Sequence, residues 1–133
     1  EEIDAIVWAT GYKVSFPFFD DPELTPKDNR LPLFKRMVKP GYENLFFLAL
    51  AQPLPTLVNF AEQQSKLAAA AVAGEYAFPD HKEMDRITAA DEKTHMGHFY
   101  QAARHTMQVD FNTYVRDLHQ EIEKGRKRAR VTA

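Results

Sequence analysis

The sequence predicts an α/β fold with few strands and about three helices, and three observations lead to that class. Two segments near the N-terminus, residues 3–9 and 44–51, are apolar at almost every position, as in strands that are buried on both faces. Residues 31–38 lie between them and also have the composition of a strand. The rest of the chain carries helix-forming residues at helical spacing, with capping residues before each run.

The first segment, residues 3–9, reads IDAIVWA, and Asp4 is its only polar member. A strand with one face in water alternates apolar and polar residues, so this run predicts a strand covered on both sides, as in a parallel sheet. Thr10 and Gly11 follow as its C-terminal end, where glycine lets a backbone or a ligand come close. We therefore expect neighbouring strands upstream in a longer protein, or a second copy of the chain that hides the exposed faces.

Two helices are expected in the middle of the chain. Asn59 is the expected cap of the first, with Glu62 as its capping-box partner, and Gly74 is expected to end it. The second is expected to begin at Asp80, where Glu83 completes another capping box.

A third helix is expected to begin near Asp110 and to end at Gly125. Its inner face is marked by apolar residues at helical spacing, namely Phe111, Tyr114, Val115, Leu118 and Ile122. The chain then divides into strands and loops over residues 1–55, a helical region over 56–125 and a loose basic tail over 126–133.

The composition excludes several functions. The chain has no cysteine, so disulfides, thiolate metal sites and a cysteine nucleophile are excluded. A net charge of -2 gives no basis for a nucleic-acid partner or an anionic membrane. No segment approaches the roughly 20 apolar residues that span a bilayer, and the first residues have no signal-peptide pattern. We expect a cytoplasmic protein without a nucleic-acid or membrane partner.

One group of side chains has the spacing of metal ligands. Asp91, His95 and His98 share a helix face if the second helix extends that far, and His105 follows shortly after. No HExxH-like pattern supports the group, and Gly97 weakens the helix within it. We therefore predict no metal site.

Several motifs in register resemble those of flavin-containing monooxygenases and their Baeyer–Villiger relatives. DAIVWATGY resembles the ATG motif of that family, and Phe16-Pro17-Phe18 resembles the aromatic stretch after it. ALAQP, residues 49–53, resembles the family's Gly-Leu-x-Gln-Pro segment, with Ala49 in place of the glycine. The helix with Glu62, Gln64 and Lys66, and the last helix, also resemble family segments; Lys66-Leu67 stands where the family often has Arg-Trp.

The resemblance implies two dinucleotide-binding domains, the cofactors FAD and NADPH, and oxygenation of a small molecule by O₂. The chain has five glycines and no GxGxxG turn, so neither phosphate-binding loop is present and the resemblance covers a C-terminal fragment. By that analogy no catalytic residue is assigned. The expected cofactor-binding residues lie at two strand ends: Thr10, Gly11, Gln52, Pro53 and Leu54.

Two other readings stay open. One is a stand-alone interaction module or dimer without catalytic activity. The other is a Baeyer–Villiger enzyme, which oxygenates ketones, in place of an enzyme that oxygenates nitrogen or sulfur.

Overall fold

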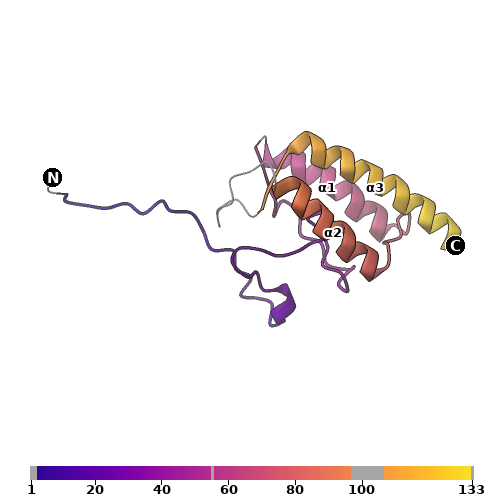
Figure 1. Cartoon of the computed structure of the whole chain (residues 1–133), viewed down its shortest axis with the longest axis horizontal. Helices are drawn as coiled ribbons and strands as arrows, with labels where there is room; N and C mark the ends of the chain where they lie inside the picture. Colours follow the sequence, from indigo (N-terminus) through magenta and orange to yellow (C-terminus); the bar gives the residue numbers. More distant parts are fainter. Residues whose placement is uncertain (1–2, 55, 97–106, 133) are drawn as a thin grey trace.

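Three helices form the body of the protein, and a long N-terminal segment extends away from them (Figure 1). The structure, a computed structural model, describes residues 3–54, 56–96 and 107–132. Its elements in chain order are a 3-10 helix η1 (Pro22–Leu24), β1 (Gln52–Pro53), α1 (Leu57–Val72), α2 (His81–Met96), β2 (Gln108–Val109) and α3 (Phe111–Thr132).

The three expected helices are confirmed, and two of their caps are the predicted ones. The Asp80 carboxylate accepts a hydrogen bond from the Glu83 amide at 2.8 Å, and Asp110 accepts one from the Thr113 amide at 2.8 Å. The cap of α1 was wrongly predicted, because the helix begins two residues before Asn59. Gly74 follows the end of α1 at a φ of 74°, in the left-handed region that glycine adopts freely.

The third helix does not end at Gly125 but continues to Thr132, so the basic tail is helical rather than loose. Gly125 has a packing role instead. A Cβ atom there would lie 2.0 Å from ring carbons of Tyr76, so only glycine lets that ring lie against the helix.

The three predicted strands are not observed. Residues 3–9 form an extended segment with exposed side chains, which we call the arm (residues 3–13). Residues 44–51 are irregular, and residues 31–38 contain a tight turn closed by the Phe34 amide on the Val38 carbonyl at 2.7 Å. A strand needs a continuous ladder of backbone hydrogen bonds with a partner. Between residues 31–38 and 44–51 the structure has a single such bond, from the Phe47 amide to the Met37 carbonyl at 2.8 Å.

Among the described residues, the strands form one short parallel ladder, and two isolated antiparallel bridges close turns at Lys27–Arg30 and Phe34–Val38. Gln52 pairs with Gln108 and Pro53 with Val109, in strands of two residues each. The protein is therefore a small α/β structure in which helices supply most of the order.

The core lies between α1, α3 and the loops before α1. Phe60 and Leu67 of α1 are fully buried against Leu118 of α3. The turn of residues 34–38 adds Phe34, Met37 and Val38 to the same cluster. Residues 31–38 were predicted as a strand, and the structure makes them a buried turn instead. Residues 44–51, predicted as a buried strand, are mostly half-buried.

Within the described residues, no helix is both long and apolar enough to cross a membrane.

Candidate functional site

The five predicted cofactor-binding residues fall into two separate places. Thr10 and Gly11 lie in the arm, where every side chain from residue 3 to 13 is exposed. Gln52, Pro53 and Leu54 lie where β1 leads into α1. The arm points away from the helices, so within the described chain the two groups are not brought together (Figure 1).

The second place has a defined geometry, and we call it the β1–α1 junction (residues 52–54 and 56–58). The Gln52 amide donates to the Met107 carbonyl at 2.7 Å, which ties the junction to β2. Thr56 is the N-cap residue of α1, and its side chain makes no capping hydrogen bond. The N-cap side chain therefore leaves the first amides of α1, at the positive end of the helix dipole, without a capping acceptor of its own.

The junction carries three large aliphatic side chains that are exposed by 49% to 77%: Leu54, Leu57 and Val58. The polar side chains of Gln52 and Thr56 are exposed beside them. Scattered exposed leucines are ordinary, but a group of them at one helix end marks a binding surface. Backbone donors beside apolar side chains suit a flat ring with acceptor atoms on its edge.

A chain of buried hydrogen bonds holds the junction in place. Gln64 of α1, fully buried, accepts from the Ala49 amide at 2.7 Å and donates to the Tyr114 hydroxyl at 2.9 Å. Tyr114 in turn donates to the Lys35 carbonyl at 2.7 Å. We call these four residues the Gln64 relay. Complete burial raises the pKa of the Tyr114 hydroxyl well above its usual value, so it stays a donor.

Sequence reasoning did not find the relay. The sequence identified Gln64 only as a motif residue and left open whether its side chain is solvent-exposed or part of a site. In the structure this side chain is the centre of the network. One signal was available, because Gln64 lies between Phe60 and Leu67 on the apolar face of α1, where a polar side chain requires partners. Glu62 and Lys66, the other two motif residues, are exposed.

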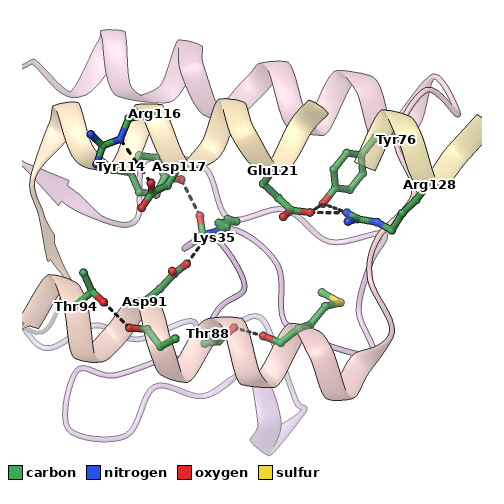
Figure 2. Close-up of polar contacts among 12 residues, drawn as sticks. Lys35, Tyr76, Thr88, Asp91, Thr94, Tyr114, Arg116, Asp117, Glu121 and Arg128 are labelled. Atoms are coloured by element: carbon green, nitrogen blue, oxygen red, sulfur yellow. Dashed lines mark hydrogen bonds and ion pairs between the residues drawn. The ribbon is translucent and has the colours of Figure 1, made fainter. Parts of the chain in front are cut away.

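A hollow of about 310 Å³ lies between α2 and α3. Figure 2 shows Lys35 reaching Asp91 at one end, with Tyr76, Glu121 and Arg128 grouped at the other. Lys35 Nζ lies 2.8 Å from Asp91 Oδ2, and Glu121 accepts from both Tyr76 Oη at 2.9 Å and Arg128 Nη2.

The carboxylates of this hollow are already paired with cations. Each of its four carboxylates has a cationic nitrogen within 4 Å, contributed by Lys35, Arg86, Arg116 and Arg128. Burial, and next the Glu121 charge, raise the pKa of Tyr76 far above its usual value. Carboxylates that are paired with cations, and a tyrosine hydroxyl that is held as a hydrogen-bond donor, are poor general bases. We therefore assign the hollow a structural role.

The predicted absence of a metal site is not contradicted where it can be examined. The described residues hold no group of three or more histidine, aspartate or glutamate side chains that could bind a metal. Asp91 instead pairs with Lys35. His98, His105 and the side chain of His95 lie outside the described residues.

Comparison with known proteins identifies the family. The sequence profile of the family described as flavin-binding monooxygenase-like matches residues 1–128. Flavin-containing monooxygenase 5 of Oryctolagus cuniculus is 33% identical over 114 residues, which are 84% of this chain and 21% of the relative. The N-oxide-forming dimethylaniline monooxygenase 2 of Rattus norvegicus is 31% identical over 124 residues, 92% of this chain and 23% of the relative.

The human flavin-containing monooxygenase 5 gives the same picture, with 31% identity over 121 residues, 89% of this chain and 22% of the relative. The chain thus spans about a fifth of the length of the curated relatives it matches. The resemblance stated from the ATG, Gln-Pro and helix motifs is confirmed, and the chain belongs to the flavin-binding monooxygenase-like family.

Proposed function

We propose that this chain is the C-terminal part of an FAD- and NADPH-dependent monooxygenase that transfers one oxygen atom of O₂ to a small organic substrate. Membership of the family, and relatives of which the matched residues make up only 21%, support this reading. Oxygenation of nitrogen or sulfur is favoured over ketone oxygenation, because matched relatives have names that specify N-oxide formation. On its own the chain is then inactive.

One observation carries the proposal, namely the β1–α1 junction. It offers an uncapped helix N-terminus among the exposed side chains of Leu54, Leu57 and Val58. The isoalloxazine ring of a flavin is flat and apolar along one part and rich in hydrogen-bond acceptors along the other. We assign Gln52, Pro53 and Leu54 to the surface that contacts this ring, and Thr10 and Gly11 to the crossing between the two nucleotide domains.

The chain's own contribution is positioning rather than proton transfer. A bound flavin supplies the O₂ chemistry, and the protein orients it and keeps water away. Backbone amides at the start of α1 stabilise negative charge on an acceptor edge, and the aliphatic side chains exclude water from it. The Gln64 relay fixes these amides by fixing Ala49 and the start of the segment that leads to them.

The positions of the glycines account for the expected inactivity of the chain alone. A dinucleotide cofactor is held chiefly through its pyrophosphate, by a glycine-rich turn at a helix N-terminus. The five glycines of this sequence are at positions 11, 41, 74, 97 and 125, too far apart for that turn. We therefore expect the purified chain to be colourless and not to bind added FAD at micromolar concentration. Stoichiometric flavin in the isolated chain would contradict the proposal.

The positive test uses the longest gene product that contains this sequence. We expect it to be yellow when purified and to oxidise NADPH in the presence of an amine or a sulfide. Activity on ketones alone would favour the Baeyer–Villiger alternative. A colourless product without NADPH oxidation would favour the stand-alone interaction module.

Two matched substitutions test the junction itself. Val58 and Val72 lie on the same helix, are 77% and 81% exposed, and differ mainly in position, since only Val58 lies at the junction. In the longer protein, Val58→Asp is expected to lower the flavin content at least tenfold, because it places a carboxylate where an electron-rich ring must lie. Val72→Asp is expected to retain full flavin content. Equal effects of the two substitutions would show that the junction is not the flavin surface.

A further inference from the structure

A buried arginine at the turn of residues 34–38 has no adequate partner. The Arg36 side chain is only 6% exposed, and it lies near the carboxylates of Asp91 and Glu92 on α2. The nearest ion pair joins Arg36 Nη1 to Glu92 Oε1 at 4.0 Å, which is too long for a hydrogen bond. Lys35 does not share this problem, because its ammonium group reaches Asp91 at 2.8 Å.

Two donors of the guanidinium remain unused. Among the residues that the structure describes, neither Nε nor Nη2 of Arg36 has a hydrogen-bond acceptor, and both atoms are shielded from solvent. A buried charged group without acceptors is unfavourable, and its desolvation lowers the pKa of Arg36 despite the nearby carboxylates. Such a group in a folded protein calls for an explanation.

The identity of the two atoms points to the missing partner. Nε and Nη2 form one edge of the planar guanidinium, and their N–H bonds run parallel. That edge matches two oxygen atoms of one carboxylate or phosphate group, which it binds through two hydrogen bonds at once. A single water or a single carbonyl oxygen would satisfy only half of it.

The Arg36 side chain is buried in a turn whose backbone conformation is energetically unfavourable. Lys35 and Arg36 have φ angles of 48° and 57°, in the left-handed region that is unfavourable for residues other than glycine. The Tyr114 hydroxyl holds the Lys35 carbonyl at 2.7 Å and so keeps the turn in this conformation. Strain that is maintained by the surrounding structure often marks a functional position.

We propose that the Nε–Nη2 edge of Arg36 binds one small oxyanion, a phosphate or a carboxylate, beneath α2. The Glu92 side chain, 39% exposed, competes for the same guanidinium and turns toward solvent when the anion binds. The proposal is independent of the flavin surface, because Arg36 lies at the 34–38 turn and the flavin surface lies at the β1–α1 junction.

The test compares anions at equal ionic strength. The thermal midpoint of the chain is measured in chloride, in inorganic phosphate and in acetate. At an anion concentration about ten times Kd, a single site raises Tm by roughly 5 °C for a domain of this size. A rise in both phosphate and acetate indicates a general oxyanion site, and a rise in phosphate alone indicates a phosphate site.

Variants identify the residue. Arg36→Lys keeps the positive charge but loses the two-donor edge, and we expect the anion-dependent rise to disappear. Arg126→Lys makes the same change at an exposed arginine, whose partner Glu123 lies 3.0 Å away, and we expect the rise to persist. Glu92→Gln removes the competing carboxylate and is expected to lower the Kd for the anion.

A direct measurement covers the case in which Arg36→Lys does not fold. The side-chain Nε–Hε resonance of Arg36 in the unaltered chain is expected to shift with the anion in a saturable way. The absence of a Tm rise and of a resonance shift would overturn the proposal. An equal Tm rise in the unaltered chain and in Arg36→Lys would overturn it as well.

Discussion

The first 54 residues and the helical part from Leu57 onward are ordered in different ways. In the helices, backbone groups bond within one element, and the described core forms where α1 meets α3. The first 54 residues form turns with hydrogen bonds of their own, such as the Phe47 amide on the Met37 carbonyl. They join the rest of the protein through the Lys35 carbonyl on Tyr114, the Ala49 amide on Gln64, and the Gln52 amide on Met107 just before β2. The arm has no such contact from residue 3 to 11 in the described structure, and it is fully exposed.

Backbone conformation shows the same contrast. Five described residues other than glycine have a positive φ, and all of them precede α1: Asp28, Asn29, Lys35, Arg36 and Ala49. Such conformations persist only where neighbours impose them. The N-terminal region is therefore shaped by its surroundings, and the helices by their own sequence.

The largest expected effect separates the two regions directly. Phe60→Ala removes a fully buried ring from α1, and we expect the free energy of unfolding to fall by about 3–5 kcal/mol. Trp8→Ala removes a larger ring from the arm, where Trp8 is 79% exposed, and we expect a change within about 0.5 kcal/mol. Urea unfolding of the chain measures both.

The comparison would fail if Trp8→Ala were as damaging as Phe60→Ala. That result would mean that the arm folds onto the body or onto a second copy of the chain. Sedimentation of the unaltered chain over a range of concentrations distinguishes those two cases.

The contrast also explains which parts of the fold could be predicted. Helices were found because their signals are local: Asp80 and Asp110 cap the amides three residues on, and the stripe of α3 recurs every three to four residues. Apolar content predicted strands over residues 31–38 and 44–51, but the first is a buried turn and the second is irregular and mostly half-buried. A strand is defined by a partner that this sequence does not specify. The arm was wrongly predicted as a strand for the same reason.

The sequence predicted where Gln52, Pro53 and Leu54 lie along the chain only in part. They do precede a helix, but the predicted strand over residues 44–51 is absent and Gln52 and Pro53 themselves form β1. Cofactor binding by these residues stays a prediction. The Gln64 relay joins residues 15 to 79 positions apart, and no pattern within the sequence encodes such a distance. Gly125 was misread as a helix end because glycine has two uses, and only the Tyr76 ring reveals which one applies.

The next effect tests the link between the two regions. Gln64→Leu keeps the size of the side chain but leaves the Ala49 amide without its acceptor and the Tyr114 hydroxyl without its donor. We expect the free energy of unfolding to fall by about 2–4 kcal/mol, since each buried group left unpaired costs about 1–3 kcal/mol. Glu62→Leu, an exposed change two residues away, is the control. Hydrogen exchange at Ala49 should accelerate in the first variant alone, and an unchanged rate would exclude the relay as the link.

A pH effect of intermediate size reports the burial of the relay. The folded pKa of Tyr114 is raised by burial above the value near 10 of an exposed tyrosine, so its contribution to stability is complete below pH 10. As the pH rises further, only the unfolded chain loses the proton, and stability falls by about 1.4 kcal/mol per pH unit for this group. Tyr114→Phe should remove that slope, whatever it does to stability at neutral pH. Tyr12→Phe, at the 95% exposed tyrosine of the arm, should leave it intact.

The smallest effect concerns the position where this sequence departs from its family. Ala49 stands in place of the glycine of the family motif, and its φ of 58° lies in the left-handed region, which is unfavourable for alanine by about 1–2 kcal/mol. Ala49→Gly relieves that strain and keeps the backbone amide that donates a hydrogen bond to Gln64. It also gives the unfolded chain more conformational freedom, which lowers stability. The net expectation is a gain of about 0.5–1 kcal/mol in the free energy of unfolding, measured in urea.

Ala69→Gly, in the last turn of α1, should have the opposite sign, because there glycine only adds freedom to the unfolded chain. A loss of stability at both positions would show that the backbone at residue 49 is not strained, and the family's glycine would then need another explanation.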